Sequence, residues 1–174
     1  MKNIFASGKI KGLEIAKLSL GGYLLYMGIN FIASMLIVFG GLKIYGWQIG
    51  ERILPFVDKN ILNLASNYNI AIIAFVIAFI IPLIEEIIFR GLLLNYLIEK
   101  TNIHSKIVVI LSAVIYALLM ATLFSNFSKI LPIFVFGLIA SAITIKAKSL
   151  YPAIILHVLN NLIGIIIEIF LFKL

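Results

Sequence analysis

The amino-acid sequence predicts an all-α protein that crosses a membrane as a polytopic bundle of about five or six helices. The 174-residue chain is 63% hydrophobic and only 12% charged, with a mean hydropathy of +1.19. Soluble domains carry roughly 45–50% apolar and 25% charged residues. The apolar residues also gather in runs of about 20, the length that a spanning helix requires. One membrane bundle therefore fits the chain better than soluble domains do.

Five apolar runs qualify as membrane helices. In chain order they cover residues 18–42, 69–98, 107–124, 130–145 and 150–172. The second run would be about 45 Å long if it were wholly helical, so we expect it to tilt, or to break near Pro82 or Gly91. The fourth run is short, and the fifth could form two pieces.

The chain divides near residue 68. Residues 1–68 hold a basic N-terminal segment, the first membrane helix and a polar loop at 45–68 that could contain an interfacial helix, and residues 69–174 form the core bundle. The first apolar run is too long for a signal peptide, so we expect it to be retained. Lysines are more frequent in the loops that face the cytoplasm if the N-terminus does, which favours that orientation.

The composition also narrows the function. The chain has no cysteine, which excludes disulfides, zinc–thiolate sites and thiol catalysis. Its formal net charge of +7 could suggest a nucleic-acid partner. No basic patch alternates with aromatic residues as in single-strand binders, however, so we expect no nucleic acid and assign the lysines to loops beside membrane lipid.

Charged residues inside the second run predict a functional site. Glu85, Glu86 and Arg90 follow about ten almost wholly apolar residues, and a charge at membrane depth costs a few kcal/mol. Glu86 and Arg90 are four residues apart, so on a helix they share a face and can pair. Glu85 points about 100° away, and a carboxylate without a cation in its own helix suits a general base or acid. The structural alternative is that all three charges form one ion network that locks the bundle.

A second polar pair lies in the last run. His157 and Asn161 are four residues apart, so a helix would turn both side chains the same way. Both can donate hydrogen bonds, and together they could stabilise a developing oxyanion. The alternative is that they join helices, as polar side chains do in bilayers.

These motifs resemble those of a known family. Glu85-Glu86-x-x-x-Arg90 and His157-x-x-x-Asn161 are similar to the first and last motifs of the CAAX-protease and bacteriocin-processing (CPBP, also called Abi) family of intramembrane endopeptidases. The resemblance implies a hydrolase of prokaryotic cell membranes that cleaves a peptide or membrane-protein substrate. By that match Glu85 would activate water, and Glu86 and Arg90 would support it. His157 and Asn161 would be the oxyanion donors.

The middle motif departs from the family pattern. The resemblance covers roughly residues 69–167. Between the first and last motifs, the family has Phe-x-x-x-His on a middle helix. The matching stretch here begins at Tyr116 and ends at Met120, and we place both residues at the substrate cavity. A thioether can neither accept a catalytic proton nor donate a hydrogen bond to water. His104, the other histidine of the chain, precedes this helix in a polar stretch, where we expect a solvated loop residue.

Three functions remain open on these grounds. The first is an active CAAX-protease-like endopeptidase. The second is a catalytically impaired relative that binds a membrane protein as a bacteriocin-immunity or accessory factor. The third, a small transporter, is disfavoured because the sequence shows no inverted repeat. A zinc site could be assembled from Glu85, Glu86 and His157, but Glu86 is claimed by Arg90, so we expect no cofactor and no metal.

Overall fold

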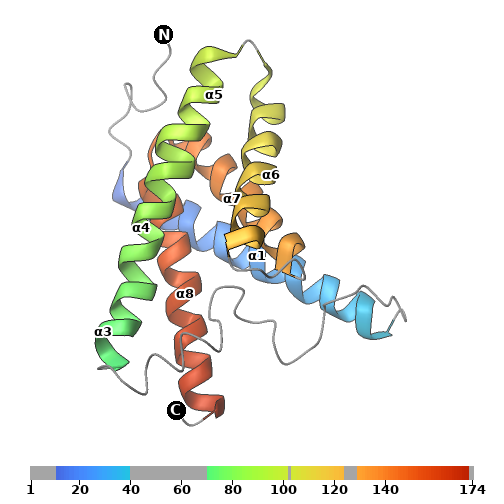
Figure 1. The fold of residues 1–174 in the computed structure, drawn as a ribbon, viewed down its shortest axis with the longest axis vertical. Helices are drawn as coiled ribbons and strands as arrows, with labels where there is room; N and C mark the ends of the chain where they lie inside the picture. The colour runs from blue at the N-terminus through green and yellow to red at the C-terminus, as the bar shows by residue number, and fades with distance from the viewer. Residues whose placement is uncertain (1–10, 40–69, 102, 124–128, 173–174) are drawn as a thin grey trace.

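The computed structural model describes residues 11–39, 70–101, 103–123 and 129–172, and over this part of the chain it is helical without a strand. The helices are α1 (Gly12–Phe39), a continuous run from α3 (Ile70–Phe75) to α5 (Asn95–Lys100), α6 (Ser105–Leu123), α7 (Ile130–Ala147) and α8 (Tyr151–Phe172) (Figure 1). The first four contain a stretch that is long and apolar enough to cross a membrane, and α8 contributes the apolar stretch Tyr151–Ile167. The predicted all-α membrane bundle is confirmed, and the protein is an integral membrane protein.

Two of the predicted helices differ from expectation. Helix α1 begins at Gly12 instead of residue 18. Its first turn carries Glu14, a charge that the positive end of the helix dipole favours, so the polar residues before the apolar run are helical too. Helix α8 is one piece. The polar loop predicted at 45–68 lies outside the described residues.

The long second run does not break at Pro82 or Gly91. It changes pitch instead, through two π-helical segments, η1 (Val76–Ile80) and η2 (Ile87–Leu94), on either side of α4 (Ile81–Glu86). A π-helix bonds each N–H to the carbonyl five residues earlier, and such segments frequently occur at functional sites. The wider turns thus flank the one helical turn that carries both glutamates.

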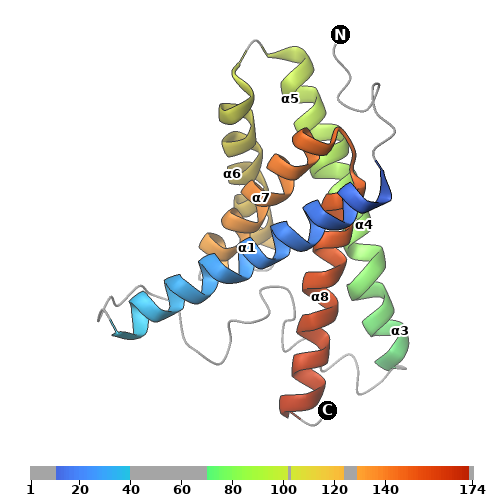
Figure 2. The same cartoon turned by 180° about the vertical axis from the view of Figure 1, so that it is seen from behind.

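The helices pack with small residues at their crossings. Figure 2 shows α1 running obliquely across α7 and α8. A Cβ atom built on Gly22 of α1 would lie 2.7 Å from Leu156 Cδ1 of α8. Between α6 and α7, a Cβ atom on Gly137 would lie 3.2 Å from Ala113 Cα and 3.1 Å from Tyr116 Cδ1. Such close backbone approach is typical of membrane helices, where packing has to drive association.

A buried core joins α1, η2, α6, α7 and α8. It contains Tyr26, Phe89, Tyr116, Ala117, Met120, Ile133, Phe136, Ile139, Ala140, Ile143, Ala153 and Leu156. Large aliphatic side chains such as Leu24, Leu92 and Leu118 remain exposed on the outer faces of the bundle, where acyl chains would cover them. The polar site therefore lies within a protein interior and not on the lipid face.

Substituting Gly137→Ala should lower the stability of the bundle by about 1–3 kcal/mol, because the added methyl meets backbone that cannot move aside. The measurement is thermal unfolding of the protein in detergent or bicelles. Gly28→Ala is the matched control, since a Cβ there has no neighbour within 4 Å. Equal unfolding midpoints for the two variants would contradict the close approach of α6 and α7.

Candidate active site

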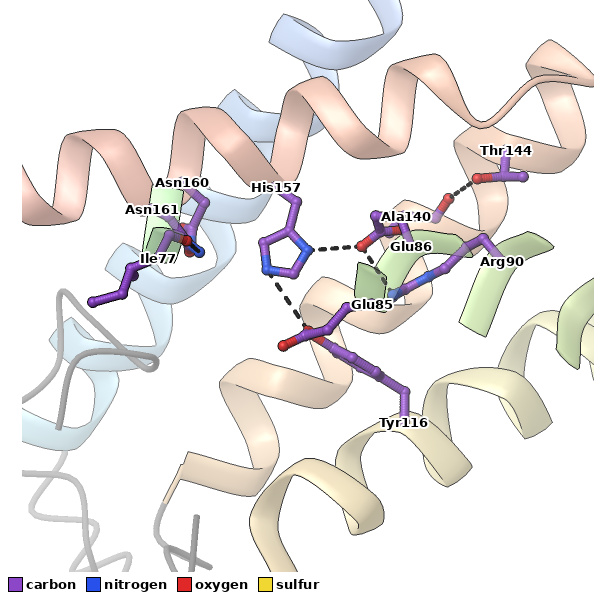
Figure 3. A network of polar contacts seen from close by, with 10 residues as sticks. All are labelled: Ile77, Glu85, Glu86, Arg90, Tyr116, Ala140, Thr144, His157, Asn160 and Asn161. Atoms are coloured by element: carbon purple, nitrogen blue, oxygen red, sulfur yellow. Dashed lines mark hydrogen bonds and ion pairs between the residues drawn. The ribbon is translucent and has the colours of Figure 1, made fainter. Parts of the chain in front are cut away.

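The most deeply buried charges form a network between the long helical run and α8 (Figure 3). Arg90 Nη1 donates to Glu86 Oε1 at 3.0 Å, and His157 Nδ1 lies 2.8 Å from the same oxygen. All three side chains have no exposed surface. A guanidinium is always charged, so Glu86 serves as its counterion. An ionised carboxylate only accepts hydrogen bonds, so His157 Nδ1 is the donor.

Aromatic rings complete the surroundings of Arg90. Its Cζ atom lies 4.3 Å from the ring centroid of Tyr116 and 5.8 Å from that of Phe136. A guanidinium over an aromatic face gains cation–π attraction, which is larger when water is absent. The Phe136 ring also contacts His157, with 4.7 Å between the centroids. Rings from α6 and α7 thus enclose the cation, and the ring from α7 also packs against the imidazole.

Glu85 points to a different set of partners. The Tyr116 hydroxyl donates to Glu85 Oε2 at 3.0 Å, and His157 Nε2 lies 3.9 Å from the same oxygen. The Glu85 side chain keeps 10% of its surface exposed, whereas Glu86 and His157 keep none. The two neighbouring glutamates therefore differ in their surroundings: Glu86 is occupied by the cation, whereas Glu85 is bound by a tyrosine and keeps a small exposed surface.

Asn161 is linked to the pitch change in the long helix. Its Nδ2 donates to the Ile77 carbonyl at 2.9 Å. In the π-helical register, Ile81 N–H bonds to the Val76 carbonyl, five residues earlier. The next bond in that register would run from the N–H of residue 82 to the Ile77 carbonyl. Pro82 has no N–H, and the Ile77 carbonyl therefore needs another donor in the apolar interior. Asn161 supplies it.

The structure brings most of the predicted site residues together. Glu85, Glu86, Arg90 and His157 lie in one network, and the predicted Glu86–Arg90 pair is confirmed. Asn161 faces the same helical run, two turns before the glutamates. Its neighbour Asn160 donates to Asn161 Oδ1 at 3.3 Å.

The network has features of both interpretations of the charges, the structural lock and the catalytic site. Glu86 and Arg90 tie η2 to α8 through His157, as a structural lock would. Glu85 lies outside that pairing and contacts α6, as a catalytic carboxylate could.

The middle-motif residues take different positions. Both belong to the apolar core, with Tyr116 fully buried and Met120 4% exposed, and the Tyr116 hydroxyl also donates to Glu85. The hydrogen bond between Tyr116 and Glu85 was not predicted. The signal for it was the hydroxyl that Tyr116 adds at the position of the family's phenylalanine. His104 is exposed at the start of α6, where its Nδ1 accepts from Lys106 N–H.

The donor set of the site differs from that of a zinc site. Among the described residues, no group of three or more His, Asp or Glu side chains is arranged to hold a metal ion. The shared Glu86 oxygen is already engaged by Arg90 and His157. A three-ligand zinc site of the usual kind does not fit this arrangement.

Comparisons with known proteins agree with the motifs. The family model for Rce1-like type II CAAX prenyl endopeptidases matches residues 67–163. The membrane-embedded CAAX protease MroQ of Staphylococcus aureus (strain USA300) is 27% identical over 140 residues, which are 80% of this chain and 53% of MroQ. The chain thus spans about half the length of this relative. No solved structure matches it. The resemblance to CAAX proteases is confirmed.

Replacing Asn161→Leu should destabilise the protein by about 0.6–1.7 kcal/mol, the range of hydrogen bonds between membrane helices. The same change in a Pro82→Ala background should cost less, because the alanine N–H at position 82 can bond to the Ile77 carbonyl. The measurement is a double-mutant cycle on reversible unfolding in bicelles. An equal cost in both backgrounds would refute the link between Pro82 and Asn161.

Proposed function

The chain belongs to the Rce1-like family of type II CAAX prenyl endopeptidases, and from this premise we propose that it is an intramembrane endopeptidase in which Glu85 activates water. One observation carries the proposal. Of the two adjacent carboxylates, Glu86 is neutralised by Arg90 inside the bundle, while Glu85 has no cation on its own helix turn and retains exposed surface. A general base must be able to reach the proton that it removes.

The proposed reaction is hydrolysis of a peptide bond. Glu85 takes one proton from a water molecule while the water oxygen bonds to the scissile carbonyl carbon. The resulting oxyanion collapses, the carbon–nitrogen bond breaks, and the proton passes from Glu85 to the amine. Every proton is accounted for by the water and Glu85.

His157 is the group best placed to act beside Glu85. Its Nδ1–H is held by Glu86, and a bond at one ring nitrogen fixes the orientation of the other. Nε2 therefore points to Glu85, 3.9 Å from its Oε2. Because Nδ1 carries the proton donated to Glu86, Nε2 would donate to an oxyanion beside Glu85 in the imidazolium form, in which both ring nitrogens are protonated. Arg90 acts through Glu86 by pairing with that carboxylate. The predicted oxyanion role of Asn161 requires its amide to exchange the Ile77 carbonyl for the substrate oxygen.

The substrate we propose is a peptide or membrane protein at the bilayer, in keeping with the description of MroQ as a membrane-embedded CAAX protease. The protein would lie in a prokaryotic cell membrane with its N-terminus in the cytoplasm, because Lys100, Lys106, Lys146 and Lys148 lie in the two connections that this orientation leaves inside. The chain has no cysteine, so a single Ser105→Cys variant, labelled from either side, tests the orientation.

Met120 favours a second candidate function. The family's histidine at this position would handle protons, whereas Met120 is buried in the apolar core and its thioether cannot. We therefore keep the alternative that the chain is a catalytically silent relative which binds a peptide or membrane protein as an immunity or accessory factor. Under this alternative Met120→His would create cleavage that the natural chain lacks.

Glu85→Gln should lower peptide cleavage by about 10²–10⁴-fold, the usual contribution of a general base. The assay uses the full chain in lipid vesicles with a library of membrane-associated peptides, read by mass spectrometry. Glu99→Gln is the matched control, since Glu99 lies on the same helical run but bonds to Asn95 outside the site.

The outcomes separate the two functions. Cleavage by the natural chain that Glu85→Gln abolishes supports the endopeptidase. Silence of the natural chain with cleavage by Met120→His supports the accessory role. The endopeptidase proposal fails if Glu85→Gln cleaves as fast as Glu99→Gln, or if neither the natural chain nor Met120→His cleaves while both remain folded.

A further inference from the structure

We propose that Tyr116 is a positioning residue of the reaction and that its hydroxyl holds the Glu85 carboxylate, which compensates for the missing middle histidine. This inference rests on the proposed function of Glu85. It concerns a group that the family pattern does not use, because a phenylalanine at this position has no hydroxyl.

The geometry fixes the tyrosine ring. Tyr116 has no exposed surface. The Phe89 ring packs edge-on against it, with 4.8 Å between the centroids, and Arg90 lies over its face at 4.3 Å. On another side the ring reaches Gly137, where a Cβ would meet Tyr116 Cδ1 at 3.1 Å. A ring enclosed in this way cannot swing, so its hydroxyl has one position.

The contact joins two elements that are distant in sequence. Tyr116 belongs to α6 and Glu85 to α4, and the hydroxyl reaches Glu85 Oε2 at 3.0 Å. A carboxylate bound at one oxygen keeps one orientation, and such preorganisation is what a catalytic group requires.

The proposed hydrogen bond between Tyr116 and Glu85 can persist through the reaction. While Glu85 is ionised, the hydroxyl donates to Oε2 and Oε1 is the atom that takes the proton from water. Once Oε1 carries that proton, Oε2 can still accept from the same hydroxyl. Tyr116 therefore loses no proton at any step. Met120, one helical turn away, has no hydrogen to donate to a carboxylate.

The test is Tyr116→Phe, which removes the hydroxyl and restores the ring of the family pattern. Cleavage should fall about 10–100-fold in kcat, the range for a hydrogen bond to a charged group, while KM changes less than about twofold because the fully buried ring has no exposed surface for a substrate to contact. Tyr26→Phe is the control, since Tyr26 is another buried tyrosine of the same core. It should keep both constants.

A second background makes the test specific. In the Met120→His background, the new imidazole can take over the hydrogen bond to Glu85. Tyr116→Phe should there lower kcat by less than about threefold, which a double-mutant cycle would record as positive coupling. An unchanged kcat in Tyr116→Phe, or an equal loss in both backgrounds, would overturn the proposal.

A readout without turnover separates this proposal from the proposed function. Infrared spectra of protein with ¹³C-labelled glutamate contain a Glu85 carboxyl band, identified by its loss in Glu85→Gln. Tyr116→Phe should move the frequency of that band and the midpoint of its pH titration, and Tyr26→Phe should not. If no variant cleaves peptide, the proposed function fails and the band alone decides the role of Tyr116. An unmoved band overturns it.

Discussion

The rest of this structure depends on one carboxylate oxygen, Glu86 Oε1, which accepts from Arg90 and from His157 inside a bundle of membrane helices. A charge that is buried without its partner is strongly destabilising, by about 3–5 kcal/mol when one member of a pair is removed. The contact thus holds α8 against the long helical run. It also gives the site its asymmetry, since Arg90 neutralises Glu86 and leaves the neighbouring Glu85 to other partners.

The pitch of the long helix sets the second constraint. Two π-helical segments flank α4, and the turn at Pro82 leaves a carbonyl that the helix cannot satisfy by itself. Asn161 satisfies it from α8, one turn beyond His157. The same face of α8 therefore supports both the shape of the long helical run and the charges that this run carries. Positions four apart in α8 contact backbone in one case and a carboxylate in the other.

The sequence could predict the features that depend on short-range spacing. The Glu86–Arg90 pair follows from residues four apart on a helix, and the membrane helices follow from long apolar runs. The bond between Tyr116 and Glu85 could not be predicted, because it depends on how α6 is placed against α4. The π-helical pitch was also missed: a proline and a glycine in an apolar run indicate a break as readily as a change of register. The start of α1 at Gly12 could not be predicted from apolar length, because the helix begins in the more polar residues before the apolar run.

The most direct test of the account is chemical modification of the two glutamates. Protein in lipid vesicles would be treated with a membrane-permeant carbodiimide, and the labelled peptides mapped by fragmentation in a mass spectrometer. The account predicts modification at Glu85, which keeps exposed side-chain surface, and protection of Glu86, whose oxygen is held by Arg90 and His157. Labelling of Glu86 at the rate of Glu85, or faster, would contradict the division of roles between the two residues.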